Sequence, residues 1–237
     1  ERATEALAAL ELLQQRPDID ATRIGLWALS QGGWVGPMAA VRSRGIAYLI
    51  IVSGPGRDAL SLGLYPAVQL LREQGVSDAE ADDAYATLRR GLTVLRAGAT
   101  AQETLDVVAP LRRYPVLRKA YQLDLAGIES MRTFLAQPQW SMSAEVFLEQ
   151  LDQPTLALFG ERDAVVDWRE SIEVYRSSFA RSGNRDLTIR TFKDADHEMV
   201  SLAKPQHADA GFAYADGYIA TMIDWLDARH FTNLPPH

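Results

Sequence analysis

The chain has 237 residues, of which 47% are hydrophobic and 23% are charged, so it carries enough apolar material for a globular core. Its net charge of −7 disfavours nucleic acid and anionic membranes as partners, and no apolar run is long enough to be a membrane span. The sequence contains no cysteine, which excludes disulfides, thiol nucleophiles and thiolate metal sites.

The chain opens within a predicted amphipathic helix, in which Ala3, Leu7, Leu10 and Leu13 recur on one face. The first residue is Glu1 rather than a methionine, so we expect native sequence upstream of it. A signal peptide, if the protein has one, would lie in that upstream segment.

The segment 24–34 is the most informative stretch of the chain, because it predicts a strand, a tight turn and a helix in succession. Its apolar run, residues 24–29, is typical of a strand buried on both faces. Two small residues, Ala28 and Gly32, lie two positions before and after Ser30. This spacing meets the steric requirement of a nucleophile elbow, the strained turn that presents a catalytic serine. The alternative is that Ser30 only caps the helix that follows.

Strands and helices alternate along much of the chain, which indicates the α/β class with a mostly parallel sheet. A helix that separates two buried strands implies a crossover between parallel neighbours. The four predicted strands cover residues 23–28, 47–52, 155–159 and 187–192. Their carboxyl ends should therefore meet at one edge of the sheet.

Residues 57–150 carry no strand signal and predict a helical insertion between the second and third strands. Capping boxes at Ser77–Glu80 and Thr100–Glu103 begin two of its helices. We interpret this insertion as a cap over the carboxyl edge of a core formed by 1–56 and 151–237; an unrelated helical domain is the alternative. Three aromatic residues are candidates for a pocket lining, although such residues more often belong to a core: Tyr65, Phe134 and Trp140.

A serine hydroxyl becomes a good nucleophile only when a base removes its proton, and imidazole is the usual base. Of the four histidines, only His197 lies in a loop that follows a strand at the edge expected to carry Ser30. The other three are expected to be solvated: His207, His230 and His237.

The base needs a carboxylate that fixes its tautomer, and two aspartates after the third strand compete for this role. Asp167 has Glu170 three residues further on, which gives it a sufficient structural role as a helix N-cap. Asp163 has no such role and is the preferred candidate, whereas Asp194 and Asp196 are interpreted as loop residues.

The strand, the serine turn and the helix together resemble the α/β-hydrolase fold family, especially its prokaryotic esterase-like members. The motif is Ser30-Gln31-Gly32-Gly33, and Ala28 stands where glycine is commoner in the family. Gly160-Glu161-Arg162-Asp163 matches the Gly-x-x-Asp context in which the family commonly carries its acid. The chain order of serine, aspartate and histidine is also the order that this fold uses.

The resemblance implies that the backbone N–H of Gln31 donates to the oxyanion, and that a second donor comes from a loop after an earlier strand. It covers nearly the whole chain but only the later strands of the expected sheet. The elbow strand would then expose an apolar edge, which is an aggregation hazard. We therefore expect that either a missing N-terminal fragment of the same protein or another chain covers this edge.

These patterns predict a serine hydrolase that cleaves a carboxylic ester through an acyl-enzyme. Ser30 would be the nucleophile, His197 the acid and base, and Asp163 the residue that orients the imidazole. The substrate would be a small acyl compound, and the chemistry needs no metal or organic cofactor. A peptidase or thioesterase would use the same triad, and a non-catalytic binding protein that retains the fold is the alternative from another class.

Overall fold

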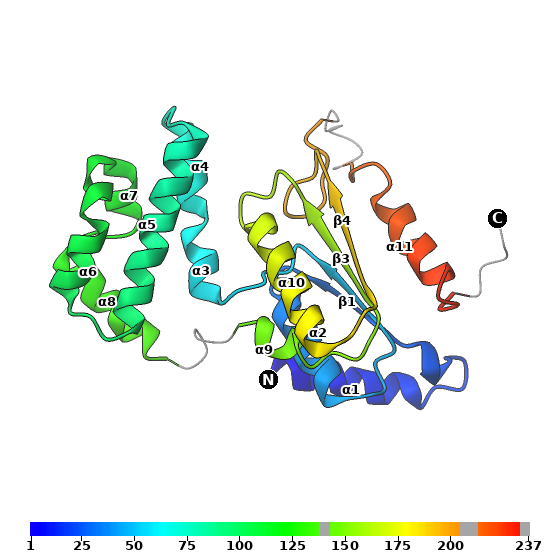
Figure 1. Ribbon diagram of the computed structural model, residues 1–237. Helices are drawn as coiled ribbons and strands as arrows, with labels where there is room; N and C mark the ends of the chain where they lie inside the picture. Colours follow the sequence, from blue (N-terminus) through cyan, green and yellow to red (C-terminus); the bar gives the residue numbers. More distant parts are fainter. Residues whose placement is uncertain (138–142, 204–212, 233–237) are drawn as a thin grey trace. The chain divides into compact units, whose positions relative to one another are not determined.

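The computed structural model describes residues 1–137, 143–203 and 213–232 (Figure 1). The chain divides into two compact units, which are treated separately below. The sheet unit comprises Glu1–Arg57 and Ser143–His237, and the helical unit comprises Asp58–Met142.

The sheet unit contains a parallel four-stranded sheet in which the strands follow one another in sequence order. The predicted α/β class is thus confirmed, and the observed strands lie within three residues of the predicted ranges. The strands are β1 (Leu26–Leu29), β2 (Leu49–Val52), β3 (Thr155–Gly160) and β4 (Leu187–Phe192). Because the register pairs Leu29 with Val52 and Val52 with Leu158, the loops after the first three strands begin at one edge of the sheet.

Helices cover both faces of this sheet, as Figure 1 shows for α10 and α11. Tyr218 and Trp225 of α11 pack with Ile50 and Leu156, whereas α2 contacts β1 and β2 on the other face. No described helix combines the length and the apolar character needed to cross a membrane. The helices of this unit are α1 (Arg2–Gln14), α2 (Gly32–Arg42), α9 (Glu145–Leu148), α10 (Trp168–Ser182) and α11 (Tyr218–Asp227), with a 3-10 turn at Ala21–Arg23.

Two predictions about buried faces are wrong. The strand before Ser30 is not buried on both faces, because Ala28 is the only buried residue of β1 and the side chain of Trp27 is 54% exposed. The three- to four-residue spacing of Ile219, Met222, Ile223 and Leu226 predicts that they share the buried face of the last helix. In α11, however, the buried positions are Tyr218 and Trp225, and Ile219 is 46% exposed. The larger aromatic side chains bury more apolar area than the aliphatic ones, so they decide which face of the helix meets the sheet.

The helical unit has a separate apolar core, built mainly from one face each of α4, α5 and α6. The predicted capping box is confirmed at Thr100, whose hydroxyl accepts from the Glu103 N–H while the Glu103 carboxylate accepts from the Thr100 N–H. Its helices are α3 (Ala59–Leu64), α4 (Pro66–Glu73), α5 (Asp78–Arg96), α6 (Ala101–Val108), α7 (Pro115–Ala120) and α8 (Leu125–Leu135), with a 3-10 segment at Ala109–Arg113.

The helical unit ends at residue 142, whereas the predicted insertion runs to residue 150. The difference is α9, which contacts α2 and α10 of the sheet unit. Tyr65 is buried in the core of the helical unit and Phe134 packs against it, while Trp140 lies outside the described residues. The role of this unit as a cap stays a prediction.

Tyr175 of α10 carries a buried hydroxyl that has no hydrogen-bond partner among the described residues. Its ring packs edge-on against Phe159, with ring centroids 5.7 Å apart, and burial raises the pKa of the phenol. Since an unsatisfied buried hydroxyl costs about 1–3 kcal/mol, we expect Tyr175→Phe to raise the free energy of unfolding by about 1 kcal/mol. Urea denaturation measures this change.

Tyr121→Phe is the matched control for this prediction. The Tyr121 hydroxyl lies 3.3 Å from the carbonyl oxygens of Gly63 and Leu64 and donates to them, so its removal should lower stability by about 1 kcal/mol. A loss of stability in Tyr175→Phe as well would contradict the prediction and indicate an internal water at that hydroxyl.

Candidate active site

Ser30 lies directly after β1 in a strained turn that leads into α2. Its φ angle is +54°, in the left-handed region that non-glycine residues seldom adopt. Its backbone N–H donates to the carbonyl of Val52 at 2.9 Å, and its carbonyl accepts from the N–H of Gly33 at 2.8 Å. Such strain at the end of a strand concentrates at functional sites and is the backbone geometry of a nucleophile elbow.

The small residues on either side of Ser30 lie against each other. A Cβ atom placed on Gly32 would be only 2.9 Å from the Cβ of Ala28. A bulky side chain at either position would therefore force the turn open. Alanine in place of the commoner glycine fits, because its methyl group occupies the space that Gly32 leaves free.

His197 and Asp163 come from different loops and meet at hydrogen-bond distance. The Nδ1 atom of His197 lies 2.8 Å from Oδ2 of Asp163, whose side chain is fully buried. The other carboxylate oxygen accepts from the N–H groups of Val165 and Val166, each at 2.8 Å. With both oxygens engaged, the carboxylate has a fixed orientation and leaves Nε2 as the imidazole nitrogen available to another partner.

Backbone contacts hold the two loops together. The N–H of Arg162 donates to the carbonyl of Ala195 at 2.9 Å, two residues before His197. A Cβ atom on Gly160 would lie 2.3 Å from the carbonyl oxygen of Asp196, so only glycine permits this close approach. The glycine of the Gly-x-x-Asp motif therefore has a steric function beneath the histidine loop.

The other acidic candidates occupy structural positions. Asp167 is the N-cap of α10 and accepts from the N–H of Glu170 at 3.1 Å, as predicted, and burial raises the pKa of its carboxyl group. Asp196 accepts from the N–H groups of Glu198 and Val200, which shapes the histidine loop. In the described structure neither carboxylate makes a hydrogen bond with the imidazole of His197.

Of the remaining histidines, the structure describes His230, which does not join this cluster. His230 is exposed and lies just beyond α11, while His207 and His237 are outside the described residues. The structure thus pairs Asp163 with His197. Within the described part of the chain, no hydrogen bond joins the Ser30 hydroxyl to the imidazole.

The start of α2 supplies candidate oxyanion donors. Gln31 is the N-cap of this helix, and in the described structure its backbone N–H makes no hydrogen bond. Such free N–H groups at a helix N-terminus favour an anion. In the described sheet no strand precedes β1, so the expected second donor has no counterpart there. Nor do the described residues contain a group of three or more His, Cys, Asp or Glu side chains placed to hold a metal.

Ser53 is a feature of this edge that the sequence reasoning missed. It follows β2 as Ser30 follows β1, with a φ angle of +47°, and its hydroxyl is buried without a partner among the described residues. The sequence feature that points to Ser53 is its position at the end of an apolar strand, directly before Gly54-Pro55-Gly56. Two strained serines therefore end neighbouring strands.

No protein-family model matches the chain, and no curated protein matches its sequence. Among solved structures it is similar to an acylaminoacyl peptidase from Pyrococcus horikoshii, with a TM-score of 0.54 and 13% identity over 99% of this chain and 29% of that one. It is also similar to Porphyromonas gingivalis dipeptidyl peptidase 4, with a TM-score of 0.49 and 16% identity over 97% of this chain and 22% of that one. An esterase from Pyrococcus furiosus has a TM-score of 0.45 and 14% identity over 83% of this chain and 53% of that one. The chain thus spans about half or less of each, and at these identities the likeness concerns the fold alone.

We expect Gly160→Ala to separate the histidine loop from the acid loop, because the new methyl group would clash with the backbone at Asp196. Overpacking of this kind lowers the free energy of unfolding by about 1–3 kcal/mol. The downfield proton NMR signal of the Nδ1–H of His197 should also disappear. Gly63→Ala is the control, since a Cβ there meets nothing within 4 Å, and it should leave this signal unchanged. An intact signal in Gly160→Ala would contradict the prediction.

Proposed function

We propose that this chain, which has the later part of an α/β-hydrolase fold, is a serine hydrolase that cleaves a carboxylic ester through an acyl-enzyme. The observation that carries the proposal is the 2.8 Å contact between His197 and a fully buried Asp163. A carboxylate with no exposure, held by two backbone N–H groups, suits a residue that orients an imidazole. The strained turn at Ser30, at the end of β1, supports the assignment of the nucleophile.

In the proposed reaction the Ser30 hydroxyl attacks the ester carbonyl while Nε2 of His197 accepts its proton. Asp163 stabilises the imidazolium that forms, and the N–H of Gln31 donates to the oxyanion, a contribution on the order of 3 kcal/mol per donor. The imidazolium then protonates the leaving alcohol, which leaves an acyl group on Ser30. Water attacks the acyl-Ser30 ester while His197 accepts its proton, and the imidazolium then returns that proton to the Ser30 oxygen as the carboxylic acid is released.

Two other functions remain candidates. A peptidase or thioesterase would use the same three residues with a different leaving group, and the fold neighbour with the highest TM-score named above is an acylaminoacyl peptidase. A non-catalytic binding protein is favoured by one observation: the described sheet begins at β1, so it supplies no loop for a second oxyanion donor. Each of the hydrolases would react covalently at Ser30, whereas the binding protein would not.

We also propose that a further strand pairs with β1, supplied by a preceding segment of the same protein or by another chain. β1 is paired on one side only in the described sheet, and it carries an exposed tryptophan, Trp27. An apolar edge with unpaired N–H and C=O groups invites association with a further strand. The same added segment would be the source of the second oxyanion donor.

Fluorophosphonate labelling tests the catalytic proposal. We expect stoichiometric modification at Ser30, located by mass spectrometry, and no modification in His197→Ala because the base is lost. Asp163→Asn should slow labelling by about 10³- to 10⁴-fold, since the imidazole loses the partner that fixes its tautomer. A panel of acyl esters, thioesters and aminoacyl amides then ranks the leaving groups.

Asp167→Asn is the matched control for the acid, because asparagine is an equally good N-cap and should keep both the fold and the labelling rate. The opposite result, with Asp167→Asn inactive and Asp163→Asn active, would reverse the assignment. A folded chain, paired with its additional strand, that does not label at Ser30 would favour the binding protein.

Self-association tests the proposed partner of β1. Expressed alone, the chain should form oligomers or aggregates, and Trp27→Lys should reduce them because a charge on an edge strand opposes pairing. Light scattering after size-exclusion chromatography measures the effect. Leu125→Lys is the control, since Leu125 is similarly exposed but lies in the helical unit. A 237-residue monomer with full esterase turnover would refute the proposal.

A further inference from the structure

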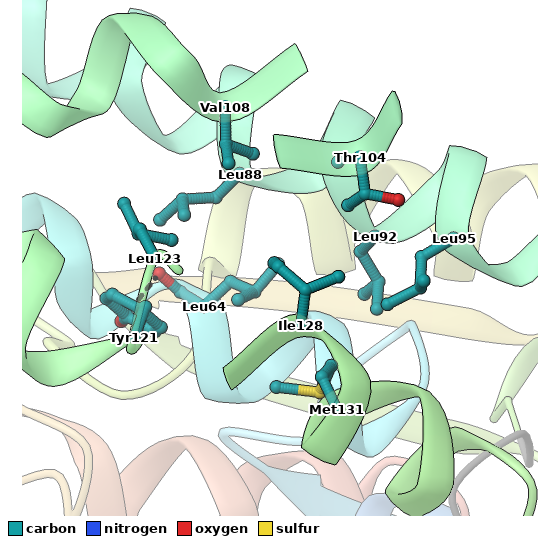
Figure 2. A pocket seen from close by; sticks show the side chains of 11 residues that line it. Leu64, Leu88, Leu92, Leu95, Thr104, Val108, Tyr121, Leu123, Ile128 and Met131 are labelled. Atoms are coloured by element: carbon teal, nitrogen blue, oxygen red, sulfur yellow. Dashed lines mark hydrogen bonds between the residues drawn. The ribbon is translucent and has the colours of Figure 1, made fainter. Parts of the chain in front are cut away.

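The core of the helical unit contains a small gap whose lining is almost entirely apolar (Figure 2). In Figure 2 the side chains of Leu92, Ile128 and Met131 lie close to one another in this lining. The gap has a volume of about 40 Å³, against ~150 Å³ for a cavity that binds benzene, so it has room for only about one or two methylene groups. It is a packing defect rather than a ligand site, and the sheet unit shows closer packing beside Ser30.

The segment 53–57, which follows β2, lies between α2 and α10 with no space for a side chain at two of its glycines. A Cβ atom on Gly33 of α2 would lie 2.6 Å from the Cα atom of Gly54. On the other side, a Cβ atom on Gly56 would lie 2.7 Å from the Cβ of Val174 in α10. Because backbone meets backbone on the α2 side, no side-chain rotation can change this separation.

Two hydrogen bonds join the segment 53–57 to the helices on either side. The indole N–H of Trp34, in the first turn of α2, donates to the carbonyl of Arg57 at 2.7 Å. The backbone N–H of Gly56 donates to the hydroxyl of Ser171 in α10 at 3.1 Å. Trp34 and Ser171 are only 6% and 4% exposed, so water does not readily replace either partner.

Arg57 contacts both helices at once. Its carbonyl accepts from α2, and its guanidinium Nε lies 2.5 Å from the carboxylate of Glu170 in α10. The backbone N–H of Glu170 in turn donates to Asp167, the N-cap of that helix. Because the Arg57 side chain is 43% exposed, the ion pair itself adds little, and the buried contacts of the two glycines carry the connection.

Each of the two helices begins close after one part of the candidate site. α2 follows Ser30, whose carbonyl accepts from the N–H of Gly33 at 2.8 Å. α10 follows the loop of Asp163, whose carboxylate accepts from the N–H of Val166, two residues before the helix. A shift of α2 against α10 would therefore change the separation between the nucleophile and the imidazole of His197.

We propose that the segment 53–57 positions Ser30 relative to His197, and that Ser171 is the positioning residue that fixes this segment to α10. The proposal rests on the proposed function, since it assigns Ser171 a part in the reactivity of Ser30 without contact with the substrate. Loss of the Ser171 hydroxyl leaves the Gly56 N–H buried without its acceptor, which frees the segment and α2 to move. A displacement of about 1 Å at a reacting group can lower a rate by about 10²-fold.

Ser171→Ala tests this role in the whole chain. We expect the amides of Ser30 and Gly33 to exchange hydrogen about fivefold faster or more, because the turn that they hold opens more often. Fluorophosphonate labelling of Ser30 should slow by up to about 10²-fold. The downfield Nδ1–H signal of His197 should persist, because the contact between the imidazole and its carboxylate is untouched. General destabilisation of the fold would not give this combination.

Ser178→Ala is the matched control. Ser178 lies two turns further along α10 and is equally buried, but its hydroxyl accepts from Arg181 rather than from the segment 53–57. This variant should leave the exchange at Ser30 and Gly33 and the labelling rate unchanged. Equal effects in Ser171→Ala and Ser178→Ala would overturn the proposal, because they would indicate a general loosening of α10.

Trp34→Phe releases the other end of the segment, because phenylalanine keeps an aromatic ring but lacks the N–H donor, and it should give the same pattern as Ser171→Ala. Unchanged exchange at Gly33 in both variants would overturn the proposal. Faster exchange with an unchanged labelling rate would overturn it as well, and would leave the hydrolase assignment intact. No labelling of the unsubstituted chain would contradict the proposed function itself, so that chain tells the two failures apart.

Discussion

The hydrogen bond between His197 and Asp163 is the constraint on which the candidate site depends. A carboxylate is costly to bury unless its charge is balanced by donors, and here two backbone N–H groups and the imidazole supply them. The same donors remove its rotational freedom, so the imidazole has one favourable orientation. The loops carrying both residues are themselves fastened by the contact between Arg162 and Ala195.

Parallel pairing explains why residues so distant in sequence can meet at all. Every strand of the described sheet points the same way, so the loops after β1, β2 and β3 begin at one edge. Positive φ angles occur at Ser30 after β1 and Ser53 after β2, and also at Met199 in the loop after β4. Strain of order 1–3 kcal/mol per residue persists only where the surrounding packing holds it, and the buried strands provide that packing.

The two units differ in the kind of side chain that their folds position. The sheet unit positions titratable groups by backbone hydrogen bonds in the loops that follow its strands. The helical unit packs leucines and alanines around a gap, and its polar side chains serve mainly as caps, as at Thr100 and Asp124.

The sequence by itself determined the strands, the α/β class and the structural role of Asp167, because periodicity and capping are local properties that neighbouring residues decide. It also singled out Ser30, Asp163 and His197 as candidates, since strand ends and small flanking residues can be read from the chain. Tertiary structure alone decided which acid meets His197, why Gly160 must be glycine, and that Tyr218 and Trp225 rather than Ile219 face the sheet. These facts depend on which distant groups approach one another, and long-range packing leaves no local pattern in the sequence.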